Sequence, residues 1–238
     1  MISAWRIQMW LDYLEREETA RSGCLLCEGF PKPGNAAELL DILNISRYRD
    51  LGLSSRDLYL ILRHITEYLP FVEYTSSKQQ CGKVFIIPGC NNYLEFPTNL
   101  SAAKKCASHG YDVYMLPNPN GGKTPDFILV KKGRYYAYEL KTIYSASSIW
   151  ERMSTALQQS DRIMLDMVDT PSSRYITYQL KSFAMTNKEV VDIMIFKGNK
   201  ELHVTPQMAS SSSFIERFMK MWNKGHLDIS GDGFCVKS

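Results

Sequence analysis

Through the first seventy residues, apolar side chains recur every three or four positions, a period that predicts helices. The pattern covers residues 3–20, 36–45 and 56–69. Pro70 ends the third of these helices, because proline lacks an amide hydrogen and clashes with the preceding helical turn. Apolar stripes of this kind pack into a core, so residues 1–70 are predicted to form a helical region.

Beyond this region, apolar residues alternate with polar ones in short runs, which is typical of strands. Helices are expected at residues 98–109, capped by Thr98 or Asn99, and at 147–159 and 214–222. The central order is helix, three strands, helix, strand, which predicts a mixed-sheet α/β sandwich and not a regular alternation of strands and helices. The expected strands cover residues 71–75, 83–88, 111–116, 126–130, 134–141, 162–168, 190–196 and 201–204.

The composition is that of an ordinary folded protein: of 238 residues, 45% are hydrophobic and 22% are charged. No apolar run approaches the roughly 20 residues needed to span a bilayer. The N-terminal residues carry charges throughout and lack the unbroken apolar stretch of a signal peptide. We therefore expect a folded protein without a membrane span, with the cytoplasm as its default location.

The net charge of +3 is small, but it is unevenly distributed. Residues 1–97 contain 10 Lys and Arg against 12 Asp and Glu, a balance of −2. Residues 98–238 contain 18 against 13, a balance of +5. A basic excess in the second part of the chain is consistent with a polyanionic partner such as nucleic acid.

Of the six cysteines, Cys24 and Cys27 form a single C-x-x-C pair. A structural zinc site would need a second such pair or a closely spaced pair of histidines. The other cysteines and the four histidines are scattered. Both readings stay open here, a zinc site and reduced, buried thiols, and the second is the simpler one.

Three charged residues are expected to meet at one end of a hairpin. A short turn, Lys132-Gly133, separates two predicted strands. Asp126 begins the first strand, and Glu139 and Lys141 lie near the end of the second. Because side chains alternate along a strand, Glu139 and Lys141 share one face, and the hairpin brings Asp126 beside them.

This trio suits the hydrolysis of a phosphodiester. Asp126 and Glu139 are hard oxygen ligands for Mg²⁺ (or Mn²⁺), which leaves its other positions to water and to a substrate phosphate. The backbone carbonyl of Leu140 is a further candidate ligand. Lys141 can orient the attacking water or stabilise charge on the phosphorus.

Pro125-Asp126 followed by Glu139-Leu140-Lys141 resembles the signature of PD-(D/E)XK nucleases. The surrounding motifs resemble more narrowly the nuclease domains at the C-termini of contact-dependent growth inhibition toxins and related phage-borne domains. The resemblance covers about residues 95–205 and does not explain residues 1–94. Its motifs occur in the order Asn99-Leu-Ser-Ala-Ala103, Gly110-Tyr-Asp-Val-Tyr-Met-Leu-Pro117, Gly122-Lys-Thr-Pro-Asp126, Tyr138-Glu-Leu-Lys-Thr142 and Gln159-Ser-Asp161.

The resemblance implies that residues 71–238 form a PD-(D/E)XK-like nuclease domain that cleaves tRNA or, less often, DNA. It also implies delivery into a target cell and an immunity protein that blocks the site. Related enzymes place a polar residue near the end of the following helix, where Gln159 stands here. Lys123 is a candidate contact to substrate phosphate.

The sequence departs from the family pattern on the helix before the first core strand. Such nucleases often carry a glutamate there that faces the metal, whereas residues 98–110 contain no acid. Thr98 stands where the acid is expected, and Glu95 just before it is the available carboxylate. Both one-metal and two-metal chemistry therefore stay open.

Two other functions remain open beside an RNA nuclease. One is a DNA endonuclease of the same superfamily. The other is a non-catalytic module that binds nucleic acid or protein on a nuclease scaffold, which the missing helix acid favours. In that case Asp126 would cap a strand, and Glu139 and Lys141 would be a surface ion pair of little energetic value.

Overall fold

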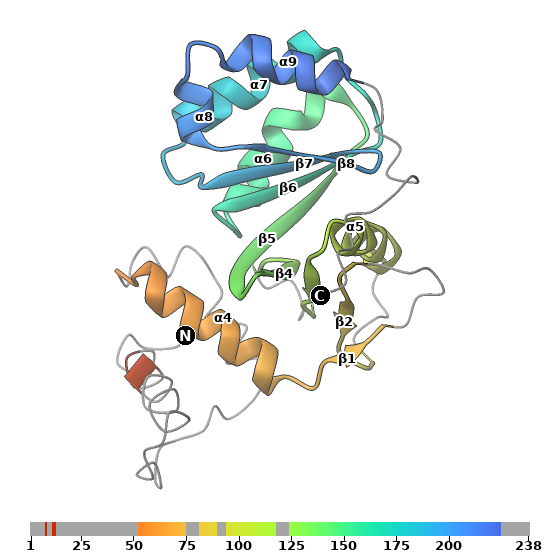
Figure 1. Ribbon diagram of the computed structural model, residues 1–238, viewed down its shortest axis with the longest axis vertical. Helices are drawn as coiled ribbons and strands as arrows, with labels where there is room; N and C mark the ends of the chain where they lie inside the picture. The colour runs from red at the N-terminus through yellow and green to blue at the C-terminus, as the bar shows by residue number, and fades with distance from the viewer. Residues whose placement is uncertain are drawn as a thin grey trace, which may run out of the picture.

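The computed structural model describes residues 8, 11–12, 52–74, 81–89, 94–117 and 124–224. Within these ranges the core is one mixed sheet of eight strands, whose spatial order from β1 to β8 follows the sequence (Figure 1). This architecture confirms the predicted mixed-sheet α/β sandwich. The strands are β1 (Val72–Glu73), β2 (Val84–Ile86), β3 (Asp112–Met115), β4 (Phe127–Lys131), β5 (Arg134–Ile143), β6 (Arg162–Met167), β7 (Asp192–Lys197) and β8 (Lys200–Val204).

Helices connect the strands that run parallel. The pairs β2–β3, β5–β6 and β6–β7 are parallel, and the others are antiparallel. A parallel pair needs a crossover, usually through a helix. Here α5 (Phe96–Ser108) joins the first pair, the 3₁₀ turn Ala146–Ser148 with α6 (Ile149–Leu157) joins the second, and α7 (Ser173–Thr186) joins the third.

The β4–β5 hairpin has the predicted two-residue turn. Lys132 and Gly133 have φ angles of 52° and 70°. Two successive residues in the left-handed region match the twist of an antiparallel hairpin, and glycine adopts that conformation without strain. Lys131 consequently pairs with Arg134, and the register places Phe127 opposite Tyr138.

Helices cover both faces of the sheet. On one face, α5 packs on a cluster that includes Phe127, Leu140 and Met164. On the other face, α4 (Ser55–Tyr68) packs Ile65 and its neighbours against Ile128. Farther along that second face, α6 and α7 cover β6 and β7, and α8 (Pro206–Ser210) and α9 (Phe214–Asn223) belong to the same cluster. Figure 1 shows α4 beside the β4–β5 hairpin and α6 to α9 beyond β6–β8.

Three helices differ from the sequence prediction, and one of them is the short, unpredicted α8. The start of α5 is Phe96, not a cap at Thr98 or Asn99, because Pro97 is favoured in the first helical turn. No helix was predicted where α7 lies. Its sequence is rich in hydroxyl, aromatic and β-branched residues of low helix propensity. Packing of its buried face, and the need for a crossover between β6 and β7, override that propensity.

Several expectations lie outside the described residues. They include most of the helix at residues 3–20, the helix at 36–45, and Cys24 with Cys27. The zinc question, and the division of the chain at residue 70, stay predictions. The apolar face of α4 nevertheless packs on the sheet, so the last predicted helix of the N-terminal region contributes to the same core. In the described ranges, no helix is both long and apolar enough to cross a membrane.

Candidate active site beside the β4–β5 hairpin

Asp126 is held beside β5 by two backbone hydrogen bonds. Its N–H donates to the carbonyl of Tyr138, with an N···O distance of 3.1 Å. The N–H of Leu140 donates to Asp126 Oδ2 at 2.9 Å. The residue just before β4 is therefore tied to the two β5 residues that flank Glu139, which brings the two carboxylates together as the hairpin geometry predicts.

Asn99 fixes the other oxygen of Asp126. Its Nδ2 donates to Asp126 Oδ1 at 3.1 Å from the first turn of α5. Asn99 is buried, although its side chain is polar. The sequence interpretation treated this residue only as a helix cap and missed it as a site residue. Because α5 begins at Phe96, Asn99 lies inside the helix and faces the hairpin.

Glu139 receives two donors on one oxygen and none on the other. Lys141 Nζ and Gln159 Nε2 both donate to Oε1, the latter at 2.7 Å. Glu139 Oε2 is buried and has no hydrogen-bond partner among the described residues. The structure thus gathers Asp126, Glu139, Lys141 and Gln159, all four of the predicted catalytic residues. It leaves one buried carboxylate oxygen without a donor.

The pair of acids is electrostatically costly when both are ionised. Burial raises the pKa of Glu139 to about 9, and the negative charge of Asp126 adds to the rise, although Lys141 opposes it. Burial likewise raises the pKa of Asp126, against the hydrogen bond from Leu140. Two carboxylates in a poorly solvated place bind a positive charge strongly, whether that charge is a proton or a metal ion.

The trio lies in a cleft of about 500 Å³. Glu95 and Thr98, the predicted upstream residues, both line it, as do Leu140 and Gln159. Arg152 of α6 also lines it, and the sequence interpretation missed this cation. Lys123, the candidate phosphate contact, lies outside the described residues.

The donor set fits a hard divalent cation with few protein ligands. In the described ranges no group of three or more His, Cys, Asp and Glu side chains forms a metal cluster. Mg²⁺ commonly takes one or two carboxylates and keeps several waters. In a strand, the N–H and C=O of one residue point to the same edge. The N–H of Leu140 reaches Asp126, so its carbonyl also faces that side and can serve as a third ligand.

No protein-family model matches the chain, and no curated protein sequence matches it. Among solved structures, the chain is similar to a chain from the "CdiA-CT/CdiI toxin and immunity complex from Burkholderia pseudomallei". The two share 17% sequence identity with a TM-score of 0.37, over 56% of this chain and 98% of the other. A likeness this distant assigns no activity, so the function is inferred from the residues of the site.

Proposed function

We propose that this protein is a metal-dependent nuclease. One observation carries the proposal: Glu139, whose buried Oε2 has no hydrogen-bond partner among the described residues, interacts with Asp126 and with a lysine two residues along the same strand. Asp126, Glu139 and the Leu140 carbonyl would hold Mg²⁺ (or Mn²⁺). When bound, such an ion polarises the phosphoryl oxygen and lowers the pKa of a bound water.

The remaining residues have separate tasks. Lys141, now paired with Glu139 Oε1, would orient the attacking water or stabilise the charge that develops on the phosphate oxygens. Gln159 holds the Glu139 carboxylate in place through its 2.7 Å hydrogen bond. Asn99 does the same for Asp126. Arg152 is placed in the cleft to contact a substrate phosphate.

The protein ligands support one metal ion better than two. Asp126 and Glu139 are the acids that interact directly. The charge of Glu95 also raises the pKa of Asp126, but it does so less than burial does. Glu95 lies at the start of α5 and lines the same cleft. We assign it to a water-mediated position beside the ion, and Thr98 to the wall of the cleft.

RNA, and tRNA in particular, is the proposed substrate, on the resemblance of the motifs from Asn99 to Asp161 to toxin nuclease domains. The same resemblance supports a toxin-like role, delivery into a target cell and inhibition by an immunity protein. Duplex DNA is the second candidate substrate for the same chemistry. A non-catalytic binding module is the candidate of another class.

The test is cleavage of tRNA and plasmid DNA by purified protein, with Mg²⁺ or with EDTA. Glu139→Ala and Lys141→Ala should abolish cleavage, because each removes a group at the reacting phosphate. Glu216→Ala and Lys220→Ala, two exposed changes on α9, are the matched controls and should leave cleavage unchanged. Cleavage that survives EDTA, or that persists in the site variants, would contradict the proposal. Which polymer is cut decides between the RNA and DNA nuclease.

A further inference from the structure

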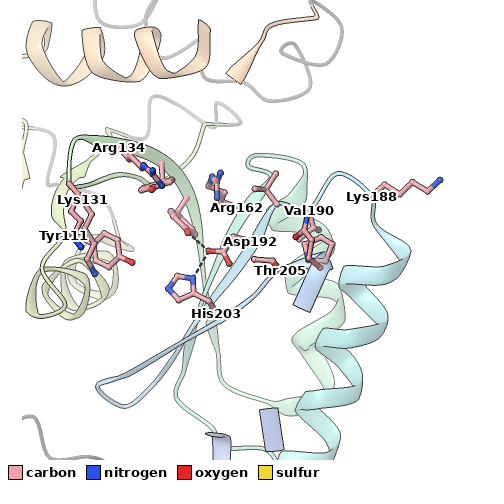
Figure 2. A pocket seen from close by; sticks show the side chains of 15 residues that line it. Tyr111, Lys131, Arg134, Arg162, Lys188, Val190, Asp192, His203 and Thr205 are labelled. Atoms are coloured by element: carbon pink, nitrogen blue, oxygen red, sulfur yellow. Dashed lines mark hydrogen bonds and ion pairs between the residues drawn. The ribbon is translucent and has the colours of Figure 1, made fainter. Parts of the chain in front are cut away.

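A second cavity lies next to the cleft along β5. Tyr138 and Glu139 are consecutive in β5 and therefore point to opposite faces. Glu139 lines the cleft, and Tyr138 lines a groove of about 1140 Å³. Figure 2 shows the groove between Tyr111, Lys131 and Arg134 on one side and Val190 and Thr205 on the other, with Arg162, Asp192 and His203 between them.

The groove is strongly cationic. Among the described residues that line it, five are lysine or arginine and one, Asp192, is a carboxylate, a formal balance of +4. The whole chain carries +3. In the part of the chain that the structure describes, none of these five cations forms an ion pair. They are Lys131, Lys132, Arg134, Arg162 and Lys188. Unpaired cations concentrated in one concave surface raise the local concentration of a polyanion.

A hydrogen-bond network of four side chains forms the floor of the groove. Tyr138 donates its hydroxyl to Asp192 Oδ2 at 2.5 Å, and His203 Nδ1 lies 2.8 Å from the same oxygen. His203 Nε2 lies 2.6 Å from Glu201 Oε1. Burial lowers the pKa of His203, but the hydrogen bonds and charges of the two carboxylates outweigh it and raise the pKa to about 9. His203 is therefore a sixth cation at neutral pH.

One atom of this floor lacks a donor. The side chain of Asp192 is 8% exposed, and its Oδ1 has no hydrogen-bond partner among the described residues. A buried acceptor without a donor is costly, so a ligand that supplies an N–H there gains binding energy. Phosphate has no such donor, whereas the edges of nucleobases do. An acidic polypeptide would bring more carboxylates towards Asp192, which disfavours it.

Tyr136 adds an aromatic surface, with the Arg162 guanidinium 5.1 Å from the centre of its ring. Sugar–phosphate backbones bind in grooves that combine cations with aromatic rings on which bases stack. The volume is close to that of pockets for drug-sized ligands, roughly 300–1,000 Å³. It suits a short single-stranded stretch and not a duplex.

The groove and the cleft are close together along the chain. Gln159 lines the cleft and Arg162, three positions further along the chain, lines the groove. Three residues span at most about 11 Å. Ser160, between them, is buried; its hydroxyl donates to the carbonyl of Ala137 at 2.9 Å and accepts from the N–H of Arg162 at 3.1 Å. The two cavities are therefore close enough along the chain for one flexible strand to occupy both.

We propose that the groove binds a single-stranded stretch of nucleic acid that flanks the phosphate held in the cleft. The rim cations hold the phosphates, and a base lies on the floor with an N–H directed at Asp192 Oδ1. The link to cleavage rests on the proposed nuclease function, but binding in the groove does not require catalysis.

The test measures binding of a fluorescein-labelled, mixed-sequence single-stranded RNA 12-mer in EDTA, by fluorescence anisotropy over a range of salt concentrations. The groove variant is Arg134→Gln/Arg162→Gln. The matched control is Arg174→Gln/Arg217→Gln, two exposed arginines on α7 and α9. Loss of two phosphate contacts should weaken binding about 25-fold at 0.1 M salt and reduce the salt slope by about 1.4, since each contact to a single strand contributes a slope of about 0.7. The control should change affinity less than about twofold.

The proposal would be overturned if the groove variant and the control variant weakened binding equally, or if neither did. In either case the groove would bind RNA no better than other exposed basic surfaces of the protein. The proposal would also be overturned if poly-glutamate of matched charge displaced the RNA as well as unlabelled RNA does, since that result would identify an acidic polypeptide site. Because EDTA removes the metal, the result is independent of nuclease activity. A protein that binds RNA through the groove but never cleaves would contradict the proposed function alone.

Discussion

The two faces of β5 form a contrast. On one face, two acids share a cleft with Lys141 and Arg152, one buried carboxylate oxygen has no donor among the described residues, and the proposed metal ion would supply further positive charge. On the other face, cations surround a single acid, and negative charge must be supplied. The alternation of neighbouring side chains along β5 turns Glu139 towards the cleft and Tyr138 towards the groove. One ligand would satisfy both cavities: a nucleic acid with one metal-bound phosphate in the cleft and further phosphates in the groove.

The largest expected effect is that of Glu139→Gln, which keeps the shape of the cleft but removes its charge. Cleavage should fall by about 10³-fold or more, since both the metal and the developing charge lose a partner. Without metal at neutral pH, the variant should be more stable than the wild type by about 1 kcal/mol, because the folded wild type must keep Glu139 protonated well above its ordinary pKa, whereas glutamine is neutral at any pH. Activity assays and thermal melts with and without Mg²⁺ measure both effects. A variant that is less stable without metal, or still stabilised by Mg²⁺, would break the assignment of this face as a cation site.

Asn99→Ala should have the next largest effect. It removes the donor to Asp126 Oδ1 and leaves both acids in place. Residues that orient metal ligands typically contribute 10–100-fold in affinity, so the Mg²⁺ concentration for half-maximal activity should rise by about that factor. A Mg²⁺ titration of the cleavage rate measures this. If kcat fell at saturating Mg²⁺ while the Mg²⁺ requirement stayed the same, Asn99 would contact substrate and not position a ligand.

The smallest predicted effect concerns the other face. The folded pKa of His203 is raised from 6.5 to about 9, so its charge stabilises the fold fully below pH 6.5, and this contribution is lost as the pH rises towards 9. Because 35% of the side chain is exposed, solvent screening reduces the contribution to about 1–2 kcal/mol. Urea unfolding of the wild type and of His203→Gln from pH 6 to 9.5 tests this. The difference in unfolding free energy should shrink across that window, and a constant difference would mean that His203 is not charged in the fold.

The two faces also differ in how far the sequence predicts them. Asp126, Glu139 and Lys141 could be grouped because one short hairpin brings them together, and the turn that does so is local. The helix before Gln159 was also predicted, although it ends at Leu157 and Gln159 lies in the turn that follows it. Asn99 was not recognised, because its contact with Asp126 joins residues 27 positions apart. The sequence pattern therefore predicts the hairpin residues of the cleft. It does not predict the contribution of α5, because that depends on how the helix packs on the sheet.

The groove was not predictable in the same way. Lys131, Arg162 and Lys188 come from separate parts of the chain, and only the sheet brings them to one surface. Nothing in the residue pattern indicated this cluster beyond the +5 charge balance of residues 98–238. The unpredicted α7 has a similar cause: its low helix propensity is overcome by packing and by the crossover between β6 and β7.

The register of β5 limits which mutations this protein can accept during evolution. A slip of one position would turn Glu139 and Lys141 towards the groove and Tyr138 towards the cleft, and would disable both cavities together. Pairing with β4 on one side and β6 on the other resists such a slip. Insertions and deletions in the Lys132-Gly133 turn should therefore be tolerated only when a bulge absorbs them before Tyr135. Single substitutions can alter either cavity independently, whereas changes of length at this hairpin affect both.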